Sequence, residues 1–329
     1  MPAGDVPAGP AIEVERLRKE YGRKVALHEL SLTVPRGEVF GFLGPNGAGK
    51  TTAVKLLTGL VRPSSGGGTL LGRPLGDRQT RRRLGFLPEL FRFHEWLTAS
   101  ELLHLHGQLL GMDSAQRRTR ISEVLDLVGL ADRARDRVGT FSKGMQQRLG
   151  LGQALLNWPD LVILDEPTSA LDPIGRRDVR VLIQRLKDAG LTVFLNSHLL
   201  SEVELVCDRV AIVDRGRVVQ EGRIEDLLSL GHESELRVTG LTELALSRLR
   251  ERWEVRETAN SPNGLQLTLS VGNETEAAEV ARFLVAHSVD LLELRPRKTN
   301  LEDVFLQWVQ GEEGGRLDLR PAESARSVA

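Results

Sequence analysis

One glycine-rich segment of this chain ends in lysine and threonine at the spacing that phosphate binding requires. It matches the pattern G-x-x-x-x-G-K-[ST] and consists of Gly44, Pro45, Asn46, Gly47, Ala48, Gly49, Lys50 and Thr51. An apolar run at residues 39–43 precedes it and a helical pattern follows, which places it between a buried strand and a helix. The glycines let backbone N–H groups up to Thr52 face one anion, and the helix dipole adds positive potential. We predict a phosphate-binding loop; the alternative is a glycine-rich turn.

Two adjacent acids add the groups that phosphoryl transfer needs. Lys50 would reach the β- and γ-phosphates of a nucleotide, and the Thr51 hydroxyl would bind Mg²⁺. Asp165 and Glu166 follow an apolar run at residues 161–164, which predicts a buried parallel strand with both carboxylates at its C-terminal edge. Asp165 suits Mg²⁺ and Glu166 suits the attacking water, because metal and nucleophile act on different sides of the γ-phosphate. The alternative is that the two acids are simply solvated.

A second helix N-terminus suited to anions lies between these segments. Residues 141–148 read F-S-K-G-M-Q-Q-R, and an Ala/Leu-rich helical run follows. Ser142 is a natural N-cap, and a helix N-terminus opened by serine and glycine attracts anions. One protomer has no evident use for two γ-phosphate sites. We therefore infer that the second site serves the nucleotide of another subunit.

These segments resemble the nucleotide-binding subunit of ATP-binding-cassette (ABC) transporters over about residues 11–228. Five motifs fall in the family's order: Walker A at the glycine-rich loop, the signature at 141–147, Walker B at 161–166, the D-loop at 169–172 and the switch histidine. The resemblance implies that His198 contacts the γ-phosphate, that Asp172 crosses a dimer interface and that Tyr21 stacks on adenine. It also implies that the signature contacts the ATP of the opposite subunit through Ser142, Lys143, Gly144 and Met145.

Two departures from the family pattern affect expected site residues. The signature usually reads Leu-Ser-Gly-Gly-Gln, whereas here Phe141, Lys143 and Met145 replace three of the five positions. Glu89 stands where the family has the Q-loop glutamine. A carboxylate can ligate Mg²⁺ or accept from water, but it cannot donate as an amide does. On the resemblance, Glu89 belongs to the catalytic and metal-binding residues with Thr51 and Asp165.

The apolar pattern and the resemblance predict an α/β P-loop NTPase of ABC type, with a mixed sheet core. Residues 12–37 read as an antiparallel β flank, residues 62–68 as a loop, and about 90–140 as a helical subdomain. Helical spacing recurs in two sets: Ile121, Val124, Leu125 and Val128, and then Val179, Leu182, Ile183 and Leu186. A strand at 192–195 and a hairpin at 209–221 complete this domain.

A second, smaller domain is expected at residues 232–310, because 329 residues exceed what one core usually supports. Alternation of Leu265, Leu267, Leu269 and Val271 with polar residues predicts a half-buried antiparallel strand. The predicted order βαββαβ, with a helix at 301–310 after it, indicates a small α+β, ferredoxin-like domain. Such an appendix resembles the tail of ATPase subunits in the drug-, antibiotic- and sodium-exporting branch of ABC systems.

Composition limits the class of protein further. A net charge of −1, from 44 basic and 45 acidic residues, gives no bulk attraction to nucleic acid or anionic membrane. The single cysteine, Cys207, excludes an intrachain disulfide and suits a reducing compartment. No apolar run approaches the ~20 residues that span a bilayer. Residues 1–10, which lack a signal-peptide layout, and residues 311–329 are predicted to be disordered tails.

Other suggestive residues have ordinary explanations. The basic run Arg81 to Arg83 is expected on a solvated face. His104 and His106 are two apart on a predicted helix, so they share no face for a metal. An aromatic cluster, Phe91, Phe93 and Trp96, directly follows the Q-loop position. It is either core or a groove for a helix of the family's membrane partner.

We expect an ATPase subunit that powers an ABC exporter by ATP-driven closure of a dimer. ATP and Mg²⁺ are the expected cofactors. Expected partners are a separate integral-membrane permease at the cytoplasmic face of the cell membrane, and a second copy or a related ATPase subunit, with no nucleic acid. The alternative is a soluble ABC mechano-ATPase acting on DNA or ribosomes. The chain has one P-loop, and the segment between Glu89 and Ser142 is too short for long coiled coils, so the sequence favours the exporter.

Overall fold

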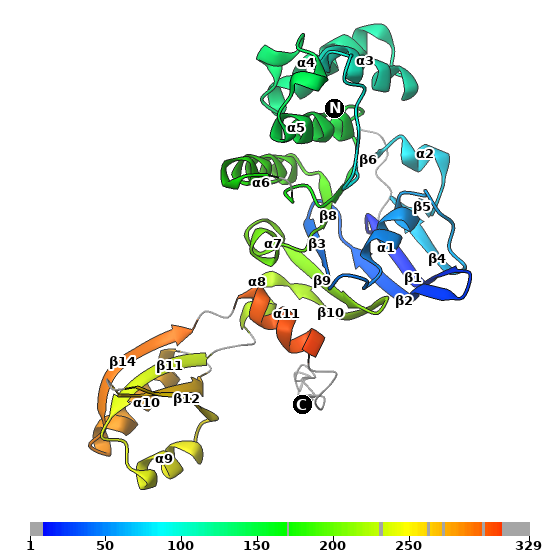
Figure 1. Cartoon of the computed structure of the whole chain (residues 1–329). Helices are drawn as coiled ribbons and strands as arrows, with labels where there is room; N and C mark the ends of the chain where they lie inside the picture. The colour runs from blue at the N-terminus through cyan, green and yellow to red at the C-terminus, as the bar shows by residue number, and fades with distance from the viewer. Residues whose placement is uncertain are drawn as a thin grey trace, which may run out of the picture. The chain divides into compact units, whose positions relative to one another are not determined.

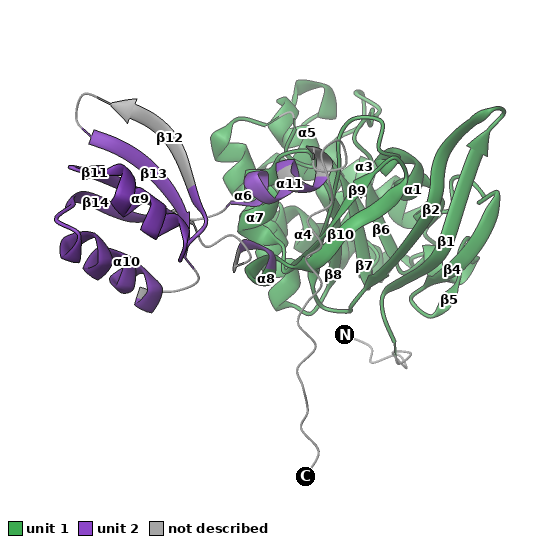
Figure 2. Ribbon diagram, turned by 90° about the horizontal axis from the view of Figure 1, so that it is seen from below, with its two compact units in different colours: residues 1–226 green, residues 227–329 purple. Residues whose placement is uncertain are grey.

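The computed structural model describes residues 9–169, 171–229, 233–261, 264–271, 274–297 and 300–310. The chain divides into two compact units, residues 1–226 and residues 227–329 (Figure 2). This division lies close to the predicted limits at 228 and 232. The two predicted tails fall almost entirely outside the described residues, and so does Ala170 of the D-loop.

A mixed, six-stranded sheet forms the centre of the first unit (Figure 1). Its strand order is β10-β9-β3-β8-β7-β6, in which only the β9-β10 pair is antiparallel. The strands are β3 (Val39–Leu43), β6 (Leu84–Leu87), β7 (Leu161–Asp165), β8 (Thr192–Asn196), β9 (Arg209–Asp214) and β10 (Arg217–Arg223). Every residue of β3, β7 and β8 is buried. The carboxyl ends of these three parallel strands meet at one edge, which brings together the loops that follow them.

The predicted antiparallel flank is a second sheet with strand order β2-β1-β4-β5. Its strands are β1 (Ile12–Tyr21), β2 (Lys24–Val34), β4 (Ser65–Leu70) and β5 (Arg73–Pro74). The prediction of a loop over residues 62–68 is wrong for its second half, because β4 begins at Ser65. Glycine is needed there for close approach: a Cβ on Gly68 would lie 2.2 Å from the Glu13 carbonyl oxygen of β1. Glycine usually marks a loop, but here it marks a tight strand pair.

The helical subdomain contains three helices that pack on one another, α3 (Ala99–Leu109), α4 (Ser114–Leu127) and α5 (Lys143–Leu155). Thr98 and Glu101 form a capping box at the start of α3, and Asp113 caps α4. The predicted apolar stripe is buried and consists of Ile121, Val124 and Leu125 of α4 and Val128 just after it. The other helices of this unit are α1 (Lys50–Leu57), α2 (Arg78–Arg81), α6 (Pro173–Asp188) and α7 (Leu200–Val206), and α8 (Ile224–Ser229) crosses the boundary between the units.

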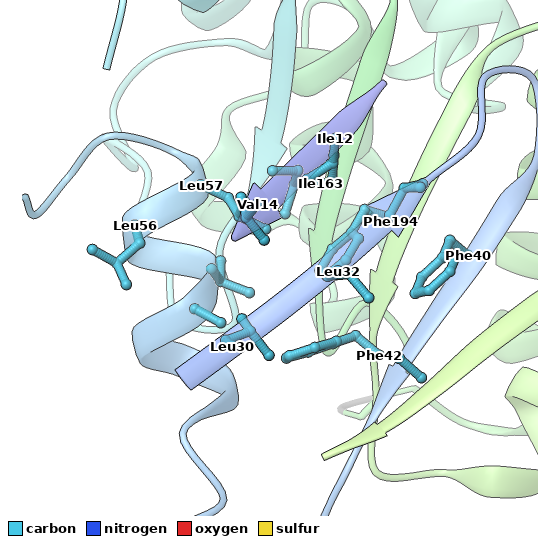
Figure 3. Packing of buried hydrophobic residues seen from close by; sticks show 14 of the residues in the cluster. Ile12, Val14, Leu30, Leu32, Phe40, Phe42, Leu56, Leu57, Ile163 and Phe194 are labelled. Atoms are coloured by element: carbon cyan, nitrogen blue, oxygen red, sulfur yellow. The ribbon is translucent and has the colours of Figure 1, made fainter. Parts of the chain in front are cut away.

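One apolar core joins the flank, helix α1 and the central sheet (Figure 3). Phe40 of β3 stacks with Phe194 of β8, and the two ring centroids are 6.1 Å apart. Leu30 and Leu32 of β2 and Leu56 of α1 belong to the same cluster. Each such side chain stabilises the fold by about 1.5–3 kcal/mol. The strand that leads into the glycine-rich loop is therefore held between buried layers.

The second unit has the predicted βαββαβ order. Its elements are β11 (Glu233–Thr239), α9 (Glu243–Arg250), β12 (Val255–Ser261), β13 (Gly264–Ser270), α10 (Glu274–Ala286), β14 (Asp290–Arg297) and α11 (Leu301–Gln310). All neighbouring strands are antiparallel, in the order β12-β13-β11-β14. Leu267 and Leu269 of the alternating strand are buried in its core. The ferredoxin-like classification stays a prediction.

In the described residues, none of the helices combines the length and the apolar character that a membrane span needs.

Candidate functional site

The glycine-rich loop connects β3 to α1 in a backbone conformation that depends on glycine. Gly47 and Gly49 have φ angles of 88° and 101°, in the left-handed region. A Cβ on Gly49 would lie 2.6 Å from the Ala26 carbonyl oxygen, and one on Gly44 would lie 2.2 Å from that of Val213. Because Gly49 caps α1 without a side-chain hydrogen bond, the first N–H groups of α1 need another acceptor. A phosphate at this position would supply one.

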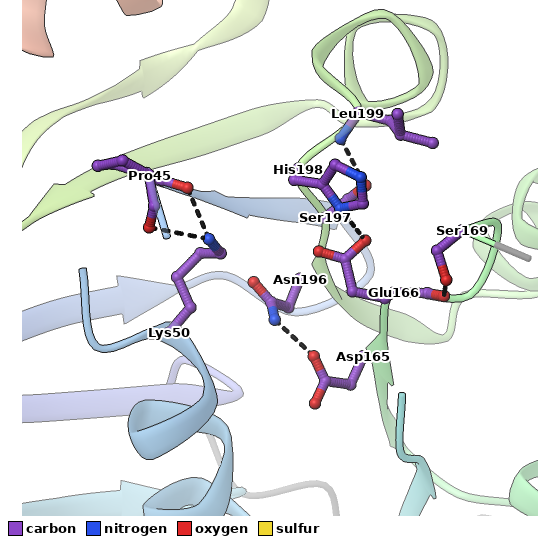
Figure 4. A network of polar contacts seen from close by, with 10 residues as sticks. Pro45, Lys50, Asp165, Glu166, Ser169, Asn196, Ser197, His198 and Leu199 are labelled. Carbon is purple, nitrogen blue, oxygen red and sulfur yellow. Dashed lines mark hydrogen bonds and ion pairs between the residues drawn. The ribbon is translucent and has the colours of Figure 1, made fainter. Parts of the chain in front are cut away.

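Lys50 is the first residue of α1, and its side chain folds back over the loop. Its Nζ donates to the carbonyl oxygens of Gly44 at 2.6 Å and Pro45 at 3.2 Å (Figure 4). Burial lowers the pKa of the ammonium group, and the carboxylates of Glu166 and Asp165 oppose that shift. A buried cation therefore faces the two predicted acids across the loop.

Asp165 ends strand β7, and its carboxylate is buried. The amide Nδ2 of Asn196, the last residue of β8, donates to its Oδ1 at 2.5 Å. Burial raises the pKa of Asp165, and the bond from Asn196 opposes the rise. Asn196 is a site residue that the sequence interpretation did not assign. The available sequence signal was a polar residue directly after the strand predicted at residues 192–195.

Glu166 lies just beyond β7 in a strained backbone conformation. Its φ angle is 52°, in the left-handed region that non-glycine residues rarely adopt. Its N–H donates to the Asn196 carbonyl oxygen at 2.9 Å, and its Oε2 lies 2.7 Å from Nδ1 of His198. Burial raises the pKa of Glu166, while the bond with His198 opposes that rise. The backbone turn directs this carboxylate toward His198 (Figure 4).

Of the two remaining predicted residues, Glu89 and Tyr21, only Glu89 is linked to this cluster by its charge. Glu89 is exposed just after β6, and its negative charge adds to the rise in the pKa of Asp165 that burial causes, so it faces the same site. Tyr21 ends β1 with 46% of its surface exposed, and Lys19 Nζ lies 5.0 Å from its ring centroid. An exposed ring is available for stacking. The stacking of Tyr21 on adenine stays a prediction.

The signature residues begin helix α5. The Ser142 hydroxyl accepts from the Met145 N–H at 3.2 Å and caps the helix, as its position predicts. Lys143 at the first helical position is exposed. Asp172 of the D-loop caps α6, because its Oδ1 accepts from the Gly175 N–H at 2.8 Å. The sequence interpretation did not foresee that structural role.

The oxygen donors predicted to bind a metal suit Mg²⁺ better than a softer metal. Thr51 offers a hydroxyl at the exposed start of α1, and Asp165 and Glu89 offer carboxylates. The described residues contain no cluster of three or more His, Cys, Asp or Glu side chains able to hold a metal unaided. Mg²⁺ is usually held by one or two carboxylates together with substrate phosphates, so this sparse donor set fits a metal bound with a nucleotide. His104 accepts a hydrogen bond from Arg117 instead of serving a metal.

Comparison with known proteins gives a consistent set of relatives. A family model described as ABC transporter matches residues 27–169. An uncharacterized ABC transporter ATP-binding protein of Nostoc sp. (strain PCC 7120) is 51% identical over 66% of this chain. The chain spans 64% of the length of that protein and of a similar one from Synechocystis sp..

Two relatives with names that describe a process match along nearly their whole length. The linearmycin resistance ATP-binding protein LnrL of Bacillus subtilis is 35% identical over 90% of this chain and 97% of its own. The bacitracin transport ATP-binding protein BcrA of Bacillus licheniformis is 33% identical over 91% of this chain and 97% of its own length.

Solved structures share the fold of the first unit. One titled as the ATP-binding subunit of an ABC transporter has a TM-score of 0.60 and 32% identity, covering 66% of this chain and 91% of that one. Another, a dimeric post-hydrolysis state of the cassette MJ0796 bound to ADP and Pi, has a TM-score of 0.59 and 26% identity. It covers 65% of this chain and 98% of that one.

Proposed function

This chain belongs to the ABC transporter family as one of its ATP-binding subunits, and we propose that it hydrolyses ATP to power an exporter. The observation that carries the proposal is the convergence of Lys50, Asp165 and Glu166 at one sheet edge, beside a glycine loop that gives the following helix no side-chain cap. The relatives named for linearmycin resistance and bacitracin transport support the antibiotic-exporting branch.

In the proposed site, the loop backbone and Lys50 bind the phosphates of ATP. Lys50 exchanges its bonds to the Gly44 and Pro45 carbonyls for bonds to the β- and γ-phosphates. Thr51, Asp165 and Glu89 would hold Mg²⁺, which neutralises phosphate charge when bound.

Glu166 is the proposed base, because its carboxylate is buried and held 2.7 Å from His198. From this position it orients a water molecule for attack on the γ-phosphorus and accepts its proton. His198 keeps the carboxylate in one orientation and is free to meet the γ-phosphate with the opposite side of its ring. The strained φ angle of Glu166 is consistent with a catalytic position.

We place the second half of each site on another subunit, a second copy or a related ATPase subunit. The signature, with Ser142 and Gly144 at an open helix N-terminus, would meet ATP bound to the partner's Walker A loop, and Asp172 would cross the interface. The dimeric cassette MJ0796, to which the first unit is similar, supports this arrangement. Closure on two ATP molecules would drive the permease, and hydrolysis would let the dimer open.

A groove beside Glu89 is the proposed contact for a separate, integral-membrane permease. A cavity of about 160 Å³ is lined by Phe91, Phe93 and Gly150, among others, and the two phenylalanine rings lie 4.9 Å apart. Trp96 is 69% exposed, which argues against core packing of the whole aromatic cluster. A helix of the permease would fill this groove and hold the subunit at the cytoplasmic face of the membrane.

The permease contact predicts the effect of a charge in the groove. We expect the purified chain to carry an integral-membrane protein with it from detergent-solubilised membranes of its source, and Phe93→Glu to lose that protein, because a carboxylate would be buried in the contact. The control variant Leu205→Glu, which changes an exposed leucine of α7, should still carry the membrane protein with it. Equal recovery of the membrane protein by both variants would place the contact elsewhere.

The binding role of Lys50 predicts a loss of affinity as well as of hydrolysis. Removing one charge-assisted contact costs about 1.5–3 kcal/mol, so Lys50→Ala should weaken ATP binding by about 10- to 100-fold in calorimetry. Lys55→Ala is the matched control, since Lys55 lies exposed on the same helix. An unchanged ATP dissociation constant for Lys50→Ala would remove Lys50 from the phosphate site.

A further inference from the structure

The side chain of Asn196 connects the two strands that bear the site. Asn196 is only 2% exposed, and its Nδ2 donates to Asp165 Oδ1 at 2.5 Å across the parallel pair β7-β8. Its backbone carbonyl accepts from the N–H of Glu166 at 2.9 Å. One residue of β8 therefore fixes the carboxylate of Asp165 and the backbone of Glu166.

The other amide atom of Asn196 is unsatisfied. Its Oδ1 is buried and has no hydrogen-bond partner among the described residues. The orientation of the amide is determined by Asp165, because exchanging Nδ2 and Oδ1 would bring two oxygens within 2.5 Å of each other. Figure 4 shows this oxygen turned to the side on which Lys50 lies. A buried acceptor without a donor, aimed at a polar site, indicates that a ligand supplies the donor.

We infer that Asn196 is a positioning residue for the divalent cation that accompanies ATP. Its Nδ2 holds Asp165 in the orientation that directs the carboxylate toward the cation, and its free Oδ1 accepts a hydrogen bond from the hydration shell of that cation. This inference rests on the proposed function, and it adds a residue that contacts the cation only through Asp165 and water.

An asparagine side chain suits this position better than other side chains of similar size. Aspartate would place a second negative charge against Asp165 and could donate no hydrogen bond to it. Leucine has a similar shape but neither donor nor acceptor. Residues that orient metal ligands in this way typically change metal affinity by about 10- to 100-fold when they are replaced.

Two variants and a matched control test the inference. Asn196→Leu and Asn196→Ser remove the amide, while Thr192→Val removes another buried polar group of β8, the hydroxyl that accepts from the Gly37 N–H at 3.0 Å. Two dissociation constants are measured: that of a non-hydrolysable ATP analogue in chelator without metal, by calorimetry, and that of Mn²⁺ for the nucleotide complex, by electron paramagnetic resonance. Thermal unfolding monitors the fold.

We expect both Asn196 variants to raise the Mn²⁺ dissociation constant about 10- to 100-fold. Their metal-free nucleotide affinity should stay within about twofold of wild type, and Thr192→Val should change neither constant. A Mn²⁺ constant within about twofold of wild type in a folded Asn196 variant would overturn the inference. So would equal loss of both affinities, or failure of both variants to fold, since either result assigns Asn196 to strand packing. Failure of the proposed function looks different: the wild-type chain itself would bind neither nucleotide nor Mn²⁺.

Discussion

Replacing Glu166 with glutamine is expected to stop ATP turnover while ATP binding continues. General base catalysis contributes about 10²- to 10⁴-fold, so steady-state hydrolysis by Glu166→Gln should fall by that factor. The ATP dissociation constant should stay within about twofold, because the amide preserves the shape of the side chain and Lys50 still binds the phosphates. Phosphate release and calorimetry measure the two quantities separately.

The environment of Glu166 explains why such a small change has a large effect. Glutamine can still bond to His198 and can adopt the same φ angle of 52°, so the local structure should persist. It cannot accept a proton from water at neutral pH. ATP should therefore trap a stable dimer of the variant, visible in size-exclusion chromatography.

A second buried glutamate provides the control for this variant. Glu202 of α7 pairs with Arg180 at 2.7 Å, and it is not among the residues that converge on the glycine loop. Glu202→Gln loses one ion pair and should hydrolyse ATP at close to the wild-type rate. Hydrolysis by Glu166→Gln within twofold of wild type would show that another group activates the water.

The parts of the site that lie within one continuous segment could be predicted from the sequence. The glycine loop and the acids Asp165 and Glu166 each stand at the end of an apolar run, and that position locates them at the carboxyl ends of buried strands. The order of elements was predictable for the same reason, because buried strands and amphipathic helices have different apolar periods.

Features that depend on contacts through space could not be predicted in this way. Asn196 meets Asp165 only because β7 and β8 are neighbours, and neither residue indicates that pairing locally. The left-handed φ angle of Glu166 has no sequence signal, and the bond from its N–H to the Asn196 carbonyl of β8 joins residues 30 positions apart in the chain. The glycine-rich sequence of β4 does not indicate a strand, because in sequence a glycine that permits close strand pairing cannot be told from a glycine that permits a turn.

The role of the signature cannot be read from one chain, since its proposed target is ATP bound to another subunit. Ser142 caps α5 within its own chain, and that role alone would explain a serine at this position. Its exposed neighbour Lys143 shows that one cation is tolerated here. Only an experiment that separates capping from contact with the opposite subunit can test the two-subunit site.

Mixing two inactive variants provides that experiment. Ser142→Arg should bind ATP through its own Walker A loop but fail to dimerise on ATP, because bulk and charge enter the closed interface. Lys50→Ala should also fail to dimerise on ATP, because its Walker A loop, the other half of the site, binds ATP weakly. A mixed dimer retains one composite site with an intact Walker A loop and an intact signature, whereas each homodimer retains none. We therefore expect ATP-dependent dimers and hydrolysis in the mixture well above either variant alone, measured by light scattering and phosphate release.

The control for this mixture must separate interface damage from loss of the helix cap, which typically costs about 1 kcal/mol. Thermal unfolding shows whether Ser142→Arg remains folded. Ser114→Arg introduces the same charge at the exposed first residue of α4, outside the proposed interface, and should dimerise normally. If Ser142→Arg and Lys50→Ala each dimerise on ATP alone, ATP does not bridge two subunits and the signature serves only its own chain. Recovery of ATP-dependent dimers and hydrolysis in the mixture cannot be explained by a signature that serves only its own chain. Each variant supplies what the other lacks only if one site is built from two chains.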